Sequence, residues 1–177
     1  MEYNSILDMA AVEKDPARRL ALVAAYSVTL LTCVETITTK PFNPLLGETY
    51  EYVCPQFKYF AEQVCHHPPI TAVHCEGKSG YLMYTCNHVK NKFTGRTYQI
   101  SASYNYYVEF PKWGDKYEIV PPQLSANNLI IGTMYIDLHG QSRIRNTKRP
   151  EYECVIEYFK RGWRGSNAFK VEGAVTV

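Results

Sequence analysis

The sequence predicts an α+β fold that is predominantly antiparallel β, in which N-terminal helices precede a curled meander of strands that forms part of a β-barrel. Three observations lead to this prediction. Residues 1–36 have helical patterning with a recognisable helix start. Apolar and polar residues then alternate with a period of two along much of the remaining chain. Short turn signals separate the alternating runs, which is typical of antiparallel strands, and a long twisted sheet tends to curl or close.

Two helices are expected in the N-terminal segment, residues 1–39. Ser5 is a candidate N-cap for a short first helix. A proline follows Asp15, which is typical of an N-cap and a first helical position, and predicts a second helix to about Thr36. Residues 20–34 carry no charge but number only 15, whereas a membrane-spanning helix needs about 20. This run is therefore expected to be a buried core helix.

Strands are expected from residue 49 onward. The alternation is clearest over residues 97–110, which predicts one strand of about 47 Å. Residues 153–158 repeat the pattern, and residues 129–138 predict a further strand with a bulge or close approach at Gly132. Turns are predicted at residues 76–80, 112–115, 139–141 and 161–167.

The last residues, 169–177, have the pattern of a strand with no turn or polar tail after it. We expect that the chain is a piece of a larger domain, or that this edge pairs with another chain, because an exposed edge strand is prone to self-association. The expected organisation is a single partial domain, with a helical segment at 1–39 and an antiparallel β portion at 40–177.

Composition excludes several functions. The net charge of +2 is too small to indicate nucleic acid as a partner, and no nucleic-acid-reading motif is present. The six cysteines contain no C-x-x-C pair, and the polar, acidic start has no secretory signal, which favours a cytoplasmic chain with free, mostly buried thiols. A zinc site built on residues 65–67 would need ligands from elsewhere. No metal and no cofactor are expected.

The most informative motif is residues 62–69, EQVCHHPP. Histidines can bind an anion or a metal, or move a proton. Pro68 fixes its own φ and favours an extended His67. Neighbouring side chains on a strand point to opposite faces, so His66 and His67 can meet one ligand only where the strand ends or bends. The motif indicates a rigid polar rim at a strand end; the alternative is a loop whose histidines bond to backbone carbonyls.

Together with residues 40–50, KPFNPLLGETY, this octet resembles the two fingerprints of the oxysterol-binding protein-related family of lipid-transfer proteins. Residues 153–158 and 162–163 resemble the family more weakly. The resemblance spans nearly the whole chain but not the whole family domain. It implies a β-barrel lipid tunnel without covalent catalysis, which takes one sterol or phospholipid, such as phosphatidylinositol 4-phosphate, from an organelle membrane by peripheral contact. It also implies that the family's N-terminal lid and C-terminal region are absent.

By matching positions, the resemblance assigns lipid headgroup contact to Lys40, Asn43, His66 and His67. Chemistry agrees with this, because a phosphate needs positive charge and several donors, which an ammonium and an amide supply. Both Lys40 and Asn43 precede a proline, so both lie on stiff, non-helical backbone. Taken alone, Lys40 is better interpreted as a solvated lysine after a helix, and Asn43 with Pro44 as a simple turn. Cys65 replaces the serine that is common in the family, which exchanges a hydroxyl for a weaker hydrogen-bonding thiol.

Two other functions remain open at this point. A thiol-dependent enzyme would use Cys65 with His66, but a nucleophile and its base need contact at about 2.6–3.2 Å, and adjacent residues on a strand diverge. A non-transferring interaction or scaffold module derived from the family would contact no lipid phosphate.

Overall fold

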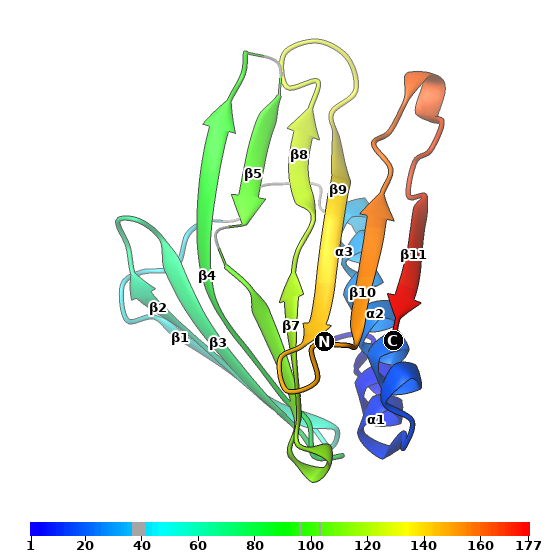
Figure 1. Ribbon diagram of the computed structural model, residues 1–177. Coiled ribbons are helices and arrows are strands. Elements are labelled where there is room, and N and C mark those ends of the chain that lie inside the picture. Colours follow the sequence, from blue (N-terminus) through cyan, green and yellow to red (C-terminus); the bar gives the residue numbers. More distant parts are fainter. Residues whose placement is uncertain (37–41, 96, 103) are drawn as a thin grey trace.

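The computed structural model describes residues 1–36, 42–95, 97–102 and 104–177 (Figure 1). The α+β, predominantly antiparallel fold expected from the sequence is confirmed. The helices are α1 (Asn4–Val12), α2 (Pro16–Val28) and α3 (Leu30–Thr36), with short 3₁₀ helices η1 (Pro111–Trp113) and η2 (Trp163–Gly165). The strands are β1 (Thr49–Val53), β2 (Phe57–Cys65), β3 (Ile70–Gly77), β4 (Leu82–Phe93), β5 (Tyr98–Ala102), β6 (Tyr106–Phe110), β7 (Asp115–Val120), β8 (Gln123–Asn127), β9 (Tyr135–Asn146), β10 (Glu153–Tyr158) and β11 (Val171–Thr176).

The strands form one antiparallel sheet in the order β1-β2-β3-β4-β5-β8-β9-β10-β11. β6 lies off this path and pairs with β4 and β7, and β7 also pairs with β9. Figure 1 shows that the sheet is curved, with β1–β3 angled away from β8–β11 and the helices beside β9–β11. The described sheet is open, with β1 and β11 at its edges, so it has the shape of part of a barrel.

The core lies between the helices and the inner face of the sheet. α2 buries Leu20 and Val23, and β10 alternates between half-buried and buried residues, with Ile156 and Tyr158 on the buried face. This alternation follows from the pleat of the strand, which presents every second side chain to the helices. No helix in the described part of the chain is both long and apolar enough to cross a membrane.

The start of α2 is confirmed, whereas the start of α1 differs from the prediction. Oδ1 of Asp15 accepts a hydrogen bond from the backbone N–H of Ala17 at 2.8 Å, as an N-cap should. Ser5 was the wrong residue for the first cap, because α1 begins at Asn4 and its N-cap position is Tyr3, which makes no side-chain cap bond.

The predicted second helix is divided into α2 and α3 at Thr29, so a single helix to Thr36 was wrong. Two hydroxyl side chains at the division bond to nearby carbonyls. Oγ1 of Thr29 donates to the carbonyl of Tyr26, and Oγ of Ser27 donates to the carbonyl of Ala24, each at 2.7 Å. Such local bonds compete with the backbone ladder of the helix, which explains the interruption within an otherwise apolar run.

Residues 97–110 form two strands rather than the single strand predicted. Both β5 and β6 pair with β4, but β5 also pairs with β8 and β6 with β7. Between them, the carbonyl of Asn105 accepts a hydrogen bond from Oγ1 of Thr85 at 3.0 Å. The alternation could not reveal this division, because both halves keep the same neighbour, β4.

The strand predicted to start at Leu129 was wrong, because β9 begins only at Tyr135 and residues 128–134 form the loop from β8. Gly132 belongs to this loop and has a φ of 95°. The predicted turn at residues 139–141 was also wrong, since these residues lie within β9. Gly140, with a φ of 85°, lies where the partner of β9 changes from β8 to β7, so glycine here permits a bend in the strand.

The remaining predicted elements are confirmed. Turns lie at residues 76–80, 112–115 and 161–167, and strands at residues 153–158 and within residues 169–177.

Candidate functional site

The described part of the first motif, residues 42–50, lies beside the second motif, residues 62–69. The backbone N–H of Gly47 donates to the carbonyl of Gln63 at 2.8 Å, and the N–H of Gln63 donates to the carbonyl of Glu48 at 3.0 Å. Gly47 has a φ of 77°, which glycine adopts without steric cost. The described part of the first motif is therefore bonded directly to the strand that carries the second.

Two side chains from these motifs hold the local backbone in place. Gln63 is buried, and its Oε1 accepts a hydrogen bond from Oγ1 of Thr71 on β3 at 2.5 Å. Oε2 of Glu48 accepts a hydrogen bond from the backbone N–H of Leu45 at 2.7 Å, which closes the turn before β1. Gln63 and Glu48 thus support the local backbone of the site.

The histidine pair lies where β2 ends. β2 stops at Cys65 after a shift in register, and residues 66–69 form the turn to β3, with a cis peptide bond between His67 and Pro68. The strand therefore ends where the motif predicts. The two imidazole rings lie 4.6 Å apart between centroids, with their planes at 63°.

The two imidazoles differ in exposure. His67 is exposed, whereas His66 is half-buried. Nδ1 of His66 is buried and has no hydrogen-bond partner among the described residues. Leaving a buried polar atom unpaired is costly, so this nitrogen lacks a partner that its burial would normally demand.

Of the four residues that the resemblance assigned to the headgroup, three are described. His66 and His67 lie together, and Asn43 is exposed in the segment that leads into β1. Lys40 lies outside the described residues. The hydrogen bond between the backbones of Gly47 and Gln63 links the segment that contains Asn43 to β2, the strand that ends just before the histidines.

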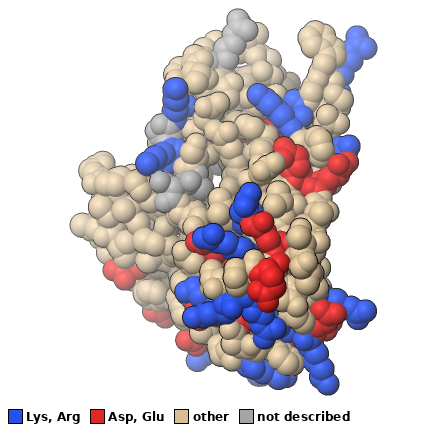
Figure 2. All heavy atoms as spheres, in the orientation of Figure 1, with Lys and Arg blue, Asp and Glu red and all other residues tan. Residues whose placement is uncertain are grey.

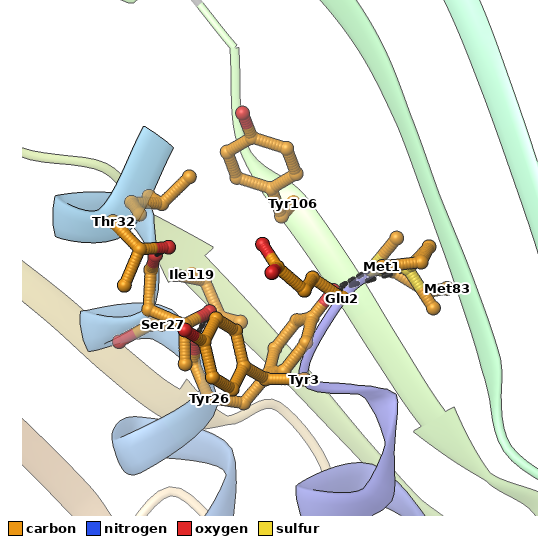
Figure 3. Close-up of a pocket in the computed structure, with 11 residues that line it drawn as sticks. Met1, Glu2, Tyr3, Tyr26, Ser27, Thr32, Met83, Tyr106 and Ile119 are labelled. Carbon is orange, nitrogen blue, oxygen red and sulfur yellow. Dashed lines mark hydrogen bonds between the residues drawn. The ribbon is translucent and has the colours of Figure 1, made fainter. Parts of the chain in front are cut away.

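A cavity of about 130 Å³ lies between α2, α3 and the concave side of the sheet (Figure 3). Its lining includes Tyr3, Tyr26, Leu30, Met83, Tyr106 and Ile119. The hydroxyl of Tyr26 lies 3.1 Å from Sδ of Met1 and 3.5 Å from Sδ of Met83. Burial raises the pKa of Tyr106, and the nearby phenol of Tyr104 adds to this effect, so the ring stays neutral at physiological pH. The cavity wall is therefore largely apolar, with a few uncharged hydroxyls and the carboxylate of Glu2.

A second, more open hollow of about 610 Å³ adjoins the first, since both are lined by Met1 and Glu2. Aromatic side chains of β1 and β2 form one of its walls. Tyr50 and Tyr59 meet edge to face with centroids 6.1 Å apart, an arrangement favoured by the charge distribution of the rings. Burial, together with the neighbouring Cys75 thiol, raises the pKa of Tyr59.

The fold and these hollows agree with a known family. A family model described as oxysterol-binding protein matches residues 1–177. The chain belongs to the oxysterol-binding protein family. This confirms the resemblance carried by the two motifs.

Similar members of the oxysterol-binding protein family are much longer than this chain. Human oxysterol-binding protein-related protein 6 is 38% identical over 178 residues, which cover 99% of this chain and 19% of that protein. Oxysterol-binding protein homolog 1 of Saccharomyces cerevisiae is 32% identical over 185 residues, which cover 99% of this chain and 15% of that protein. The chain spans a fifth or less of the length of these relatives.

Solved domains of the family share the fold. The Osh1 ORD domain in complex with ergosterol matches with a TM-score of 0.87 and 32% identity, covering 98% of this chain and 42% of that chain. The Osh3 ORD of Saccharomyces cerevisiae in complex with PI(4)P matches with a TM-score of 0.84 and 25% identity, covering 93% of this chain and 44% of that chain. The chain thus corresponds to less than half of each solved chain.

Sequence reasoning identified the histidine pair at the end of β2 but missed the cavity residues. Tyr26, Met83 and Tyr106 lie on α2, β4 and β6, and their positions in the sequence are those of ordinary core residues. The only hint was the high tyrosine content of 15 residues, which does not indicate where they converge.

Proposed function

We propose that this chain is a lipid-binding and transfer module that holds one sterol or phospholipid on the concave side of its sheet. The observation that carries this proposal is the pair of adjoining hollows beside the helices. Sites for small molecules usually enclose about 300–1,000 Å³, so the cavity of about 130 Å³ needs the adjoining hollow of about 610 Å³ to hold a whole lipid. Solved relatives that hold ergosterol and PI(4)P support the same function for this chain.

The free energies of chain burial and of headgroup hydrogen bonding indicate different roles for the cavity and the rim. Burying one CH₂ group gains about 0.8 kcal/mol, so a chain of about 16 carbons represents about 13 kcal/mol that would be lost on leaving the bilayer for water. A charge-assisted hydrogen bond contributes only about 1.5–3 kcal/mol. The apolar wall must therefore make extraction possible, and the rim selects the headgroup.

We infer that Lys40, Asn43, His66 and His67 contact a phosphorylated headgroup at this rim. Support comes from the adjacent imidazole rings and from the unpaired Nδ1 of His66. Protonated imidazoles donate from both nitrogens, and a bound phosphate favours that form.

Transient peripheral contact with organelle membranes from the cytoplasm follows from this function, since lipid must be taken from a bilayer. The free cysteines among the described residues are compatible with that reducing compartment. The exposed edge strand β11 remains a candidate for pairing with another chain.

Native mass spectrometry after incubation with mixed liposomes tests the proposal. The unmodified chain should retain one lipid per chain. The double variant His66→Ala/His67→Ala should lose phosphatidylinositol 4-phosphate but keep sterol, because only the headgroup contact is removed.

A matched control is His74→Ala, an exposed histidine on β3 whose Nε2 lies 3.4 Å from Oε1 of Glu76. This variant should bind both lipids as the unmodified chain does. Equal retention of the phosphoinositide by the double variant and the control would contradict the headgroup assignment. Absence of any bound lipid in the unmodified chain would contradict the lipid-binding function itself.

A further inference from the structure

Three strand connections reach the same end of the molecule. They are the turn between β4 and β5, the loop at residues 128–134 between β8 and β9, and the loop at residues 159–170 between β10 and β11. Figure 1 shows all three at the top, opposite α1 and the β6–β7 connection, whereas the turn at residues 66–69 lies to the left. This end is therefore distinct from the histidine rim.

Large apolar side chains project from these connections. Trp163 is 85% exposed, Ile131 79% and Ile130 68%. Phe93, Leu129, Met134 and Phe169 are also exposed there. Single exposed apolar residues are normal, but protruding residues at three neighbouring tips indicate a surface that meets an apolar phase.

The backbone of the 159–170 loop is held in place while it presents the indole. The N–H of Gly162 donates to the carbonyl of Ser166 at 2.7 Å, and further backbone bonds follow up to residue 170. Arg164, Asn167 and Phe169 have φ values of 56°, 57° and 59°, a region that residues other than glycine seldom adopt. A sequence of such residues fixed by internal hydrogen bonds keeps Trp163 outward instead of letting it fold back onto the sheet.

The 128–134 loop is organised in the same way. Asn128 has a φ of 59°, and its Nδ2 donates to the carbonyl of Thr133 at 3.2 Å, which ties the two ends of the loop together. Ile130 and Ile131 lie between these ends and face solvent. Two independent loops thus hold apolar residues outward.

Cations accompany the apolar tips. Residues 159–170 contain four basic residues and no acidic one, and residues 127–134 carry no charge at all. Lys90, Lys92, Lys160 and Arg164 are exposed. On the face seen in Figure 2, Lys and Arg atoms reach the tip of one hairpin and its flanks, whereas Asp and Glu atoms begin lower. The whole chain has a net charge of only +2, so this positive character is local.

We propose that these tips form a docking surface for an anionic lipid bilayer. We define the tip surface as Lys90, Lys92, Phe93, Ile130, Ile131, Lys160, Trp163 and Arg164. The indole and the isoleucines enter the interfacial region of the bilayer, where tryptophan is favoured, and the cations face the acidic headgroups. This inference rests on the proposed function in one respect, since a module that takes up lipid must reach a membrane.

The tryptophan content of the chain permits a direct test. The two tryptophans are Trp113 and Trp163, so the Trp113→Phe variant reports Trp163 alone. Vesicles of phosphatidylcholine and phosphatidylserine should shift its emission to the blue, and brominated acyl chains should quench it. Emission that stays unchanged on addition of these vesicles would overturn the proposal.

Flotation with the same vesicles tests the contribution of each part. The variant Ile130→Ser/Ile131→Ser/Trp163→Ser should lose vesicle binding by on the order of tenfold or more, because it removes the inserted apolar surface. Lys160→Glu/Arg164→Glu should bind weakly wherever phosphatidylserine is present. The matched control Val12→Ser/Lys14→Glu changes an exposed apolar residue and an exposed cation at the opposite end, and should bind like the unmodified chain.

Binding of a soluble lipid, flotation and self-association separate the competing explanations. The tip variants should still bind a soluble, short-chain phosphatidylinositol 4-phosphate, and His66→Ala/His67→Ala should still float with phosphatidylserine vesicles. If the unmodified chain does not bind the short-chain phosphatidylinositol 4-phosphate, the proposed function is contradicted but the proposed docking surface is not. Normal vesicle binding by the tip variants, together with loss of self-association in sedimentation velocity, would show that the surface meets another protein chain and would overturn the proposal.

Discussion

Arg19 and Asp115 form a buried ion pair that joins the start of α2 to the start of β7, with Nε of Arg19 2.8 Å from Oδ2 of Asp115. Both side chains are almost fully buried. The hydroxyl of Tyr117 donates to the same carboxylate at 3.2 Å, and Nε of Arg149 lies 3.2 Å from its Oδ1. The guanidinium of Arg19 also stacks on Trp113, 4.9 Å from the ring centroid. These contacts attach the helices to the lower end of the sheet.

Replacing Arg19 with methionine should destabilise the fold by about 3 kcal/mol, because a buried carboxylate loses its main partner. Urea unfolding measures the change. Arg18→Met is the matched control, since Arg18 is exposed and lies 3.9 Å from Asp15, and surface pairs of this kind contribute about 0–1 kcal/mol. Equal stability of the two variants would show that Arg149 alone satisfies Asp115.

The pH dependence of stability should have a component from His139. Burial lowers the pKa of His139, and the nearby Lys160 lowers it further while Asp137 acts in the opposite direction. The unfolded chain therefore binds a proton more readily, so this contribution is complete above about pH 6.5 and is lost as the pH falls through the lower folded pKa.

Urea unfolding between about pH 7 and pH 5 checks this, because the unfolded imidazole titrates near 6.5. His139→Gln should flatten the decline in stability on acidification, whereas His74→Gln, at an exposed site, should leave it as it is. A decline that is the same in both variants would assign it to other groups.

The buried thiol of Cys75 should resist alkylation. Burial raises its pKa to about 11 from 9.0, which lowers the thiolate fraction by on the order of a hundredfold at neutral pH. Cys86 is exposed and should react first with iodoacetamide. Peptide mass spectrometry over a time course distinguishes the two sites. Labelling of Cys75 at the rate of Cys86 would mean that the β3 strand opens readily.

Replacing Cys65 with serine separates lipid binding from thiol chemistry. Cys65 ends β2 beside the histidine turn, and the substitution keeps its size and restores a hydroxyl there. Lipid retention in native mass spectrometry should be unchanged, since the proposed binding uses no covalent step. A complete loss of lipid-dependent activity with an intact fold would favour the thiol-dependent alternative.

The sequence predicted correctly those helix and strand ends that depend on a few neighbouring residues. Asp15 caps α2 through its own carboxylate, and β2 ends where two prolines follow the histidines. The division at Thr29 was not predicted, because hydroxyl bonds to nearby carbonyls do not alter an apolar pattern. Ile130 and Ile131 were assigned to a strand for a related reason: hydrophobic periodicity assumes burial, and these residues face solvent.

The candidate site was predicted only in part. The histidines were recognisable because the motif places both beside a strand end, and the structure brings their rings together. The cavity residues could not be recognised, since Tyr26, Met83 and Tyr106 converge only after the sheet has curved around α2. Lys40 stays a prediction.

Strand β9 is the only strand that pairs the β10–β11 hairpin to the rest of the described sheet. It pairs with β8 before Gly140 and with β7 after it. An excursion that frees β9 from β7 and β8 leaves that hairpin, and Trp163 with it, attached to the helices through the packing of β10 against α2. The hairpin that presents the indole is therefore held from two sides, by its pairing with β9 and by its packing on α2, and we expect these elements to open as one cooperative unit.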